Sequence, residues 1–499
     1  MLTFSNKRKY SGQIIFSSDS NFFAISKGVQ LVVYSTQLLK PIKIYTFIDF
    51  IEDIKWSNDN NLLLVGLYRR NRCEIRNIQK DNYLCTIDEG IQGISNSLFS
   101  PNSLYVLTIN GNITKLAIRS LENKSSLSID LPKFSKRGIS FSSKGNGNFM
   151  ALAERKDIKD IIGIYYTTKW ACIRRFKTET EDLQDIKWSY DNSSLIIIDT
   201  PALCRFLIYN ILGELINNIE MYQNKLGIKK FEISPNGHYF CFGLYDQSLR
   251  IYNSISYTCM SIFNHDKDFL NNKQVNYYKE EIINSEGGTK YIELEPPIDL
   301  KNENIYIKGK NLFNDKMPNI GISKISFSYD NYFLATKNDN MPNVLFIWDL
   351  NIMNLQTVLI HLNEISYFQW CKNKNILFIC TNNNKIYYYT LDSCKILQLS
   401  NDFHSKSLVF SNDGRIMIVK DTNNFIMVHI DSQNDINNEI NLKLGEINNQ
   451  GEQQEMEKEN EEAEEQFEEE IAPGEGEGEG EEYEEGQHYE EVEENGEEK

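Results

Sequence analysis

Side chains that could support catalysis are scattered along the chain, without the spacing that a catalytic site requires. None of the six histidines belongs to an HExxH pair, the arrangement that holds a catalytic zinc on one face of a helix. No GxSxG elbow presents a serine nucleophile, and no GxxxxGK[ST] loop is available to cradle a phosphate. Gly145-Asn146-Gly147 matches only half of a dinucleotide fingerprint, and it falls in an expected turn between two strands. We therefore expect a protein that is not an enzyme and that holds no cofactor.

Metal and redox chemistry are disfavoured by the spacing of the candidate ligands. His265-Asp266 follows an expected strand, and we interpret it as a solvated loop pair in preference to a metal site. The nine cysteines form no CxxC pair, and an odd number without a secretory signal predicts reduced thiols. Cys371 and Cys380 flank one expected strand pair, where buried small apolar side chains are the better interpretation. The sequence therefore predicts no metal site.

Neither a membrane nor a nucleic acid is an expected partner. The longest apolar runs, such as 195–198, are far shorter than the roughly 18 residues that a membrane span needs. Lys7-Arg8-Lys9 is not followed by an apolar segment, so no secretory signal is predicted. The first 450 residues carry a net charge of only +4, which is weak for a protein that must neutralise phosphates. The basic pairs are accordingly interpreted as solvated faces: Arg69-Arg70, Arg174-Arg175 and Lys229-Lys230.

The end of the chain is a highly acidic tail. Residues 451–499 contain 24 glutamates and two lysines, a net charge of −22 within the whole chain's −18. Such a segment cannot bury enough apolar surface to offset chain entropy, so it is predicted to be disordered. Its Gly-Glu run, 474–483, resembles the acidic tails of tubulins, although low-complexity coincidence is the simpler interpretation. We expect the tail to be dispensable for folding and to tune association with partners electrostatically.

A repeated phrase organises the rest of the chain. An aromatic or aliphatic residue is followed by Ser or Cys, a polar stretch and an apolar run. Nine copies are spaced 40, 43, 42, 47, 45, 94, 43 and 40 residues apart. A period of roughly 40–45 residues is that of a WD40 propeller blade. The second residues of the nine copies are Ser17, Ser57, Ser100, Ser142, Ser189, Ser234, Ser328, Cys371 and Ser411.

One unit shows why this phrase predicts a β blade. Residues 231–253 contain three short apolar runs separated by the turns 235–237 and 245–248, and one further strand fits in the linker. The fold class is therefore predicted to be all-β: a WD40 β-propeller of about seven to nine blades, enlarged or split into two partial rings. A closed ring requires the chain ends to complete one blade jointly. Three tryptophans that open strands at the same repeat position should pack between neighbouring blades, namely Trp56, Trp188 and Trp370.

These patterns give the domain boundaries. Residues 1–435 form the propeller, 436–450 a linker and 451–499 the disordered Glu-rich tail. The 94-residue gap contains an insertion at about 265–319, and a loop of this length is typical of a functional or disordered segment.

Two segments are candidate partner-binding sites. Charge follows an apolar strand directly at Glu154, Arg155, Lys156 and Asp157, which predicts a charged hairpin turn and a contact on the rim of the ring. Residues 338–349 lead to the literal Trp-Asp dipeptide of WD40 repeats, Trp348-Asp349. The candidates in that segment are Asn338, Asp339, Asn340 and Asn343.

The chain resembles the WD-repeat protein eight (WRAP-type) family of centrosomal and spindle-pole WD40 proteins. The resembling stretches run in the same order from about residue 10 to residue 430, and several lie outside the blade consensus. They include 45–57, 86–90, 150–160, 180–188, 226–229 and, most clearly, 332–343. The insertion and the acidic tail do not match the family pattern.

The resemblance implies a non-catalytic scaffold at microtubule-organising centres that helps to anchor microtubule minus ends and to assemble spindle or ciliary-base complexes. The implied partners are a coiled-coil centrosomal or satellite anchoring protein and a minus-end-directed kinesin. The implied location is the cytoplasm and cytoskeleton, at the centrosome, spindle pole or basal body. Two alternatives stay open: a WD40-like translation-initiation scaffold, and a propeller hydrolase, which the missing nucleophile elbow disfavours.

Overall fold

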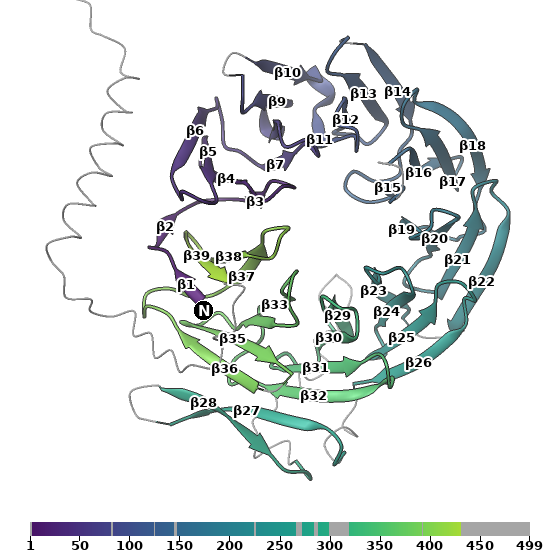
Figure 1. The fold of residues 1–499 in the computed structure, drawn as a ribbon. Coiled ribbons are helices and arrows are strands. Elements are labelled where there is room, and N and C mark those ends of the chain that lie inside the picture. The colour runs from purple at the N-terminus through teal and green to yellow at the C-terminus, as the bar shows by residue number, and fades with distance from the viewer. Residues whose placement is uncertain are drawn as a thin grey trace, which may run out of the picture. The chain divides into compact units, whose positions relative to one another are not determined.

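Nine sheets of short antiparallel strands, arranged around a common centre, make up the part of the chain that a computed structural model describes (Figure 1). That part comprises residues 2–80, 83–123, 125–143, 147–223, 226–265, 272–283, 288–298, 319–391 and 393–430. The all-β propeller prediction is confirmed, with nine blades, as many as the repeat units in the sequence. Within these ranges the helical segments are two single 3₁₀ turns, η1 (Tyr68–Arg70) and η2 (Gly90–Gln92). The predicted linker and acidic tail lie outside the described residues, as do Gly145 and Asn146.

Blades 1 to 6 and blade 8 are each built from four consecutive strands, and in every blade the first strand named below faces the centre of the ring (Figure 1). From the innermost strand outward, the blades are as follows: blade 1, β3 (Ile14–Phe16), β4 (Phe22–Lys27), β5 (Gln30–Ser35) and β6 (Pro41–Thr46); blade 2, β7 (Asp53–Trp56), β8 (Leu62–Leu67), β9 (Arg72–Asn77) and β10 (Leu84–Asp88); blade 3, β11 (Ile94–Phe99), β12 (Tyr105–Asn110), β13 (Lys115–Ser120) and β14 (Ser126–Asp130); blade 4, β15 (Ile139–Phe141), β16 (Phe149–Lys156), β17 (Lys159–Tyr166) and β18 (Ala171–Lys177); blade 5, β19 (Asp185–Trp188), β20 (Ser194–Ile198), β21 (Cys204–Asn210) and β22 (Leu215–Tyr222); blade 6, β23 (Ile228–Ile233), β24 (Tyr239–Leu244), β25 (Ser248–Asn253) and β26 (Cys259–Asn264); blade 7, β29 (Ile322–Phe327), β30 (Phe333–Asn338), β31 (Val344–Asp349), β32 (Asn354–Ile360), β27 (Asn276–Ile282) and β28 (Thr289–Leu294); blade 8, β33 (Tyr367–Trp370), β34 (Leu377–Cys380), β35 (Lys385–Thr390) and β36 (Ser393–Gln398); blade 9, β37 (Ser407–Phe410), β38 (Ile416–Lys420), β39 (Asn424–Ile430) and β1 (Leu2–Phe4), with β2 (Arg8–Lys9) also paired to β39.

The repeated phrase of the sequence is the turn between the first and second strands of a blade. In blade 9 the Ser411 hydroxyl donates to Asp413 Oδ1 at 2.5 Å and accepts the backbone N–H of Ile416 at 3.0 Å. The Asp413 backbone N–H then donates to Ser20 Oγ of blade 1 at 3.0 Å. The phrase therefore recurs because a Ser with a following Asp or Asn closes the turn locally and places its backbone against the next blade. The same serine bond to the backbone N–H five residues later occurs at Ser17, Ser57, Ser100, Ser189, Ser234 and Ser328.

The three tryptophans of the first strands pack as predicted between neighbouring blades. Each indole ring faces a phenylalanine from the second strand of the preceding blade, at a centroid distance of 6.3–6.4 Å. Trp188 and Trp370 are buried, whereas Trp56 is half-buried. The pairs are Trp56–Phe22, Trp188–Phe149 and Trp370–Phe333.

The ends of the described chain close the ring in one blade, as predicted. Strand β1 pairs antiparallel with β39, with Leu2 opposite Ile430 and Phe4 opposite Val428. Strand β2 pairs with the other end of β39. The N-terminal strand therefore supplies the outermost position of blade 9, a position that the C-terminal strands alone leave open.

Part of the predicted insertion is strand, and it enlarges blade 7. Strand β27 adds to the outer strand β32 in parallel, and β28 pairs antiparallel with β27. Figure 1 shows this hairpin outside the ring, next to blades 7 and 8. The interpretation of 265–319 as one long loop is therefore wrong for these two strands, because apolar and β-branched residues there pair with an available sheet edge. The segments 266–271, 284–287 and 299–318 lie outside the described residues.

A buried carboxylate fastens this hairpin to blade 8. Glu280 of β27 is 1% exposed, and its Oε1 accepts the Tyr387 hydroxyl at 2.8 Å. Its Oε2 accepts the backbone N–H of Leu362 at 3.0 Å, and Lys385 Nζ lies 3.7 Å from the carboxylate. Beside it, the Tyr291 hydroxyl of β28 lies 3.0 Å from Nδ1 of buried His361. The hairpin is thus held by hydrogen bonds to buried groups, each of which would be costly to leave unpaired.

We predict that Glu280→Gln lowers the free energy of unfolding by about 1–3 kcal/mol, because the buried Lys385 loses its charge partner and one hydrogen bond is weakened. Glu281→Gln is the matched control, since the Glu281 side chain is 48% exposed and its ion pair with Lys279 spans 3.7 Å. The control should change stability by less than about 0.5 kcal/mol. Denaturant unfolding of the two variants decides the question, and equal stabilities would show that the hairpin is not fastened by Glu280.

Candidate interaction surface

The direction of the strands sorts the loops onto two faces of the ring. The chain reverses at each antiparallel strand, so the loop before the first strand and the turn between the second and third strands lie together. We call this side the upper face, and the side with the other turns the lower face. Both predicted partner-binding segments are turns between second and third strands, in blades 4 and 7, and so both lie on the upper face. Blades 5 and 6 separate them, so they do not form one site.

The charged hairpin of blade 4 is confirmed, and its tip has an unusual backbone. Strands β16 and β17 pair along eight residues each, up to Lys156 opposite Lys159. The two residues of the turn, Asp157 and Ile158, both have positive φ angles, of 51° and 65°. Such a turn matches the twist of a hairpin but favours Asn and Gly, so a β-branched residue there is strained. Ile158 is also 86% exposed.

Glu154, predicted to contact a partner, belongs to the interior instead. It is 5% exposed, its Oε1 accepts the Tyr165 hydroxyl at 2.6 Å, and its Oε2 lies 3.0 Å from Arg175 Nε. Burial raises the pKa of Glu154, and the hydrogen bond from Tyr165 and the charge of Arg175 only partly offset this. A direct partner contact is therefore not supported for Glu154, because its oxygens already satisfy buried donors.

An ion-pair network fixes the base of the same hairpin. Lys133 Nζ lies 2.8 Å from both Asp160 and Asp182, and Arg155 Nη1 lies 2.9 Å from Asp182. Burial alone would raise the pKa of Asp182, but the hydrogen bonds and charges of Lys133 and Arg155 outweigh it and lower the pKa. Because the side chains of Lys133 and Asp160 are 4% and 1% exposed, this network holds three loop segments in one geometry. The exposed tip therefore stands on a rigid support.

The blade 7 candidates are mostly turn residues. Asn338 and Asn343 are fully buried, and their amide nitrogens donate to the backbone oxygens of His265 and His361 at 3.3 and 2.9 Å. These contacts tie the turn to the residues that follow β26 and β32, so a direct partner contact is not supported for either asparagine. Asp339 is half-buried and pairs with Lys229 at 2.6 Å. Partner binding stays a prediction for Asp339 and half-buried Asn340, as it does for exposed Arg155, Lys156 and Asp157.

The interpretation of His265 as a solvated loop residue is wrong. Its side chain is fully buried, and Nε2 lies 2.7 Å from Thr336 Oγ1, which accepts the indole N–H of Trp348 at 2.8 Å. Its Nδ1 lies 3.1 Å from the backbone oxygen of Gln247. A carbonyl only accepts, so Nδ1 carries a hydrogen. Burial lowers the pKa of His265 from 6.5 to about 3, so the ring is neutral at neutral pH and its Nε2 accepts from the Thr336 hydroxyl.

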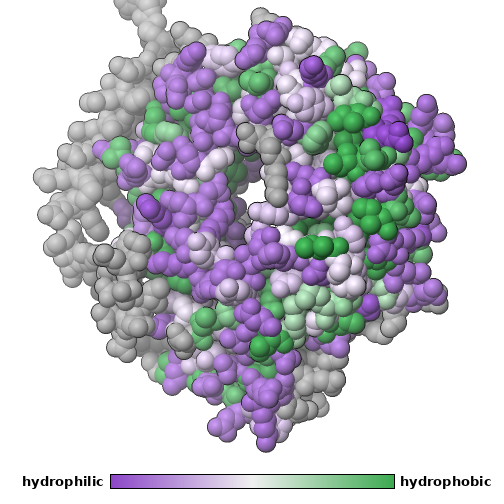
Figure 2. Space-filling view, turned by 45° about the vertical axis from the view of Figure 1, so that its right-hand side comes forward, coloured by the Kyte–Doolittle hydropathy of each residue, from purple (hydrophilic) through white to green (hydrophobic). Residues whose placement is uncertain are grey.

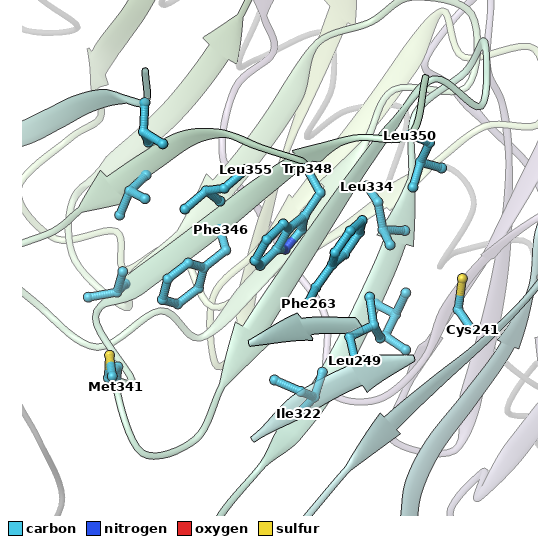
Figure 3. Close-up of a cluster of buried hydrophobic side chains, with 14 of the residues drawn as sticks. Cys241, Leu249, Phe263, Ile322, Leu334, Met341, Phe346, Trp348, Leu350 and Leu355 are labelled. Carbon is cyan, nitrogen blue, oxygen red and sulfur yellow. The ribbon is translucent and has the colours of Figure 1, made fainter. Parts of the chain in front are cut away.

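Trp348 of this network sits in the core shared by blades 6 and 7. Figure 3 shows its ring stacked on Phe263, with a centroid distance of 4.3 Å and an interplanar angle of 5°. The Trp-Asp dipeptide of the sequence thus marks a core position. Within the described ranges, no group of three or more His, Cys, Asp or Glu side chains is placed to hold a metal ion; Asp266 lies outside those ranges. Cys371 and Cys380 are buried, as predicted.

Sequence reasoning missed the apolar residues that the upper face exposes. Leu131, in the loop before blade 4, is 42% exposed and has a positive φ of 59°. Ile158 is likewise exposed and has a positive φ. The loops before blades 2 and 3 present Phe50 and Ile91, which are 57% and 105% exposed. For Ile158 a signal existed, because a two-residue hairpin turn with Ile where Gly is expected indicates strain. For the others only the structure shows the exposure.

In the described residues, the basic pairs and the inner side of the ring are weaker candidates for a partner-binding site than the upper face. Arg69, Arg70 and Lys230 lie 2.8–3.0 Å from carboxylates, so their charges are balanced locally. A cavity of about 520 Å³ is lined by the first strands of blades 1 to 4 and the turns that follow them, and it includes Lys55. The Lys55 amine already donates to Asn96 Oδ1 at 2.9 Å.

The outer side of the ring has exposed apolar residues as well. Figure 2 shows a mainly hydrophilic surface with hydrophobic side chains gathered toward its right-hand side. Outer strands in blades 4 to 6 carry exposed side chains, which are Ile173, Leu215, Ile216, Met260 and Ile262. In blade 7 the hairpin β27–β28 covers the corresponding strand. No helix of the described residues is long and apolar enough to cross a membrane.

The chain is similar to two WD repeat-containing proteins and to one WD40 domain of known structure. The WD repeat-containing protein WRAP73 of Mus musculus is 30% identical over 439 residues, which cover 84% of this chain and 94% of that relative. An uncharacterized WD repeat-containing protein of Schizosaccharomyces pombe is 28% identical over 230 residues, 44% of each chain. The C-terminal WD40 domain of Sif2 is a similar solved structure, with a TM-score of 0.48 and 9% identity over 86% of this chain and 99% of that one. No protein-family model matches the chain.

Proposed function

The chain belongs to the WRAP73 type of WD repeat-containing proteins, and from this premise we propose that it is a non-catalytic scaffold at the centrosome or spindle pole. In this role it helps to anchor microtubule minus ends and to assemble spindle or ciliary-base complexes. The observation that carries the proposal is the similarity to WRAP73 over 84% of the chain, in addition to the family stretches of the sequence. The proposed partners are a coiled-coil anchoring protein and a minus-end-directed kinesin.

The geometry of the propeller supports a scaffold. A closed ring is rigid, and its loops are presented on two faces and along an outer side. Exposed apolar side chains occur on the upper face and on the outer strands, so more than one protein can bind at once. Binding by separate surfaces requires no chemistry from the ring itself.

Localisation of the tagged full-length protein tests the proposal. We expect foci that coincide with a marker of microtubule-organising centres throughout mitosis, and unfocused spindle poles when the protein is depleted. A WD40-like translation-initiation scaffold is the alternative, and the nine blades are compatible with it. A diffuse cytoplasmic signal together with co-sedimentation with small ribosomal subunits would overturn the spindle-pole proposal in favour of that alternative.

A further inference from the structure

The loop before blade 4 and the hairpin tip of blade 4 form one continuous rim. The backbone N–H of Arg155 donates to the Leu131 oxygen at 3.0 Å, and that of Lys133 donates to the Ala153 oxygen at 2.8 Å. The loop therefore runs along β16 and brings its exposed residues beside the tip. We call this surface the blade 4 rim, and it consists of Leu131, Lys136, Arg137, Lys156, Ile158 and Lys159.

The blade 4 rim exposes apolar side chains in a conformation that they rarely adopt. Leu131 and Ile158 have φ angles of 59° and 65°, where the Cβ atom crowds the following carbonyl. Outliers of this kind cluster at binding and catalytic sites, where the surrounding structure holds them in place. Here the buried pair of Lys133 and Asp160 supplies that support.

The charge around these two side chains is mainly positive. Lys136, Arg137, Lys156 and Lys159 are all exposed. The acidic residues near them are Asp130, Asp157 and Asp185, together with Asp160 and Asp182. Asp160 and Asp182 pair with Lys133 and Arg155, so the four exposed basic side chains of the rim outnumber the remaining three acidic ones. A cluster of positive side chains attracts an oppositely charged segment and orients it on approach.

We propose that the blade 4 rim binds an acidic segment of a partner protein, in which glutamates or aspartates alternate with large apolar residues. This inference rests on the proposed scaffold function and names the chemistry of one partner. Carboxylates of the segment face the four basic side chains, and its apolar residues cover Leu131 and Ile158. Because the rim is held rigidly, little conformational entropy is lost on binding. Two aliphatic tips offer too little apolar surface to hold a bilayer, and a nucleic acid would leave them uncovered.

A labelled synthetic peptide in which pairs of glutamates alternate with leucine and phenylalanine tests the proposal on the full-length protein. We expect binding that weakens as salt rises, because exposed charges contribute to it. Replacing the glutamates by glutamines, or the leucines and phenylalanines by serines, should each weaken binding about tenfold or more. Absence of binding to the acidic apolar peptide at high micromolar concentration would overturn the proposal.

Variants of the rim locate the binding. Ile158→Gly should weaken binding about tenfold while leaving the thermal midpoint unchanged or higher, because glycine relaxes the strained backbone. The double change Lys156→Glu and Lys159→Glu should have a similar effect on binding. The matched controls are Ile255→Gly, an 82% exposed isoleucine on the lower face, and Lys169→Glu, an exposed lysine on the lower face of the same blade. If the controls weaken binding as much as the rim variants, the rim is not the site.

Two further outcomes separate this inference from the proposed function. Binding of duplex RNA or of anionic vesicles that depends on the two lysines but not on Ile158 would replace the peptide by another class of partner, and so would overturn the inference. Rim variants that bind no peptide yet still mark spindle poles in full would overturn a role of the rim in recruitment and leave the scaffold function intact. A protein that binds the peptide but never reaches the poles would support the inference about the rim and overturn the proposed spindle-pole function.

Discussion

Deletion of residues 2–9 should destabilise all nine blades, not only the last one. The deletion removes β1 and β2, and with them the antiparallel pairing along β39 and the half-buried side chains of Leu2 and Phe4. The edge of β39 is then left open, and the ring is held at this point only by contacts between blades 9 and 1. We expect a loss of about 4 kcal/mol or more in the free energy of unfolding, and a soluble fraction that falls on heating. Deletion of 410–431 removes the partner strand and should act in the same way.

Point changes on two outermost strands provide the matched comparison for ring closure. Phe4→Asp places a charge on the strand that closes the ring, where Phe4 packs on the cluster of blades 8 and 9. Ile44→Asp makes the same change on β6 of blade 1, at a side chain that is 43% exposed. Only Phe4→Asp should lower the thermal midpoint strongly. If the deletion of 2–9 is as stable as the full chain in calorimetry, the β1–β39 pairing does not close the ring in solution.

Lowering the pH from 7 to 5 should remove about 4 kcal/mol of stability through two histidines. Burial lowers the pKa of both His265 and His361 from 6.5 to about 3. Below pH 6.5 the unfolded chain therefore binds protons that the folded chain does not bind. The stability is thus present above pH 6.5 and is lost as the pH falls toward 3. At pH 5 each histidine contributes a loss of about 2 kcal/mol, at about 1.4 kcal/mol per unit of pH.

Protonation of carboxylates also changes stability in acid. The histidine effect is therefore isolated by comparing variants in the slope of the free energy of unfolding against pH. His265→Gln removes one titrating group, and should reduce the loss between pH 7 and pH 5 by about half of the histidine contribution even if the variant is less stable at pH 7. His404→Gln is the control, because His404 is exposed. Urea unfolding at several pH values gives both slopes. Identical slopes for His265→Gln and the unchanged protein would contradict a buried neutral His265.

The architecture could be predicted because the features that specify it are local. The turn at Ser411 is closed by bonds to residues two and five positions away, so its residues stand together in the sequence and recur with every blade. Blades 1 to 6 and blade 8 then pair strands that follow one another in the chain, and the position of the tryptophans repeats with the blades. Nine periodic phrases therefore sufficed to predict an all-β propeller whose ends meet.

The candidate site depended on contacts between distant parts of the chain. His265 bonds to Thr336, 71 residues away, and Glu280 bonds to Tyr387, 107 residues away, so no local pattern distinguishes these side chains from solvated ones. Glu154 stands in a charged run, yet it is buried and pairs with Arg175 of β18, the outermost strand of blade 4. The sequence alone determined the nine repeat units, which predicted an all-β ring of about seven to nine blades, and the charged hairpin that begins at Glu154. Only the tertiary structure decided which polar residues are buried and that Ile158 is exposed, because burial depends on what packs across from a residue and not on its neighbours in the chain.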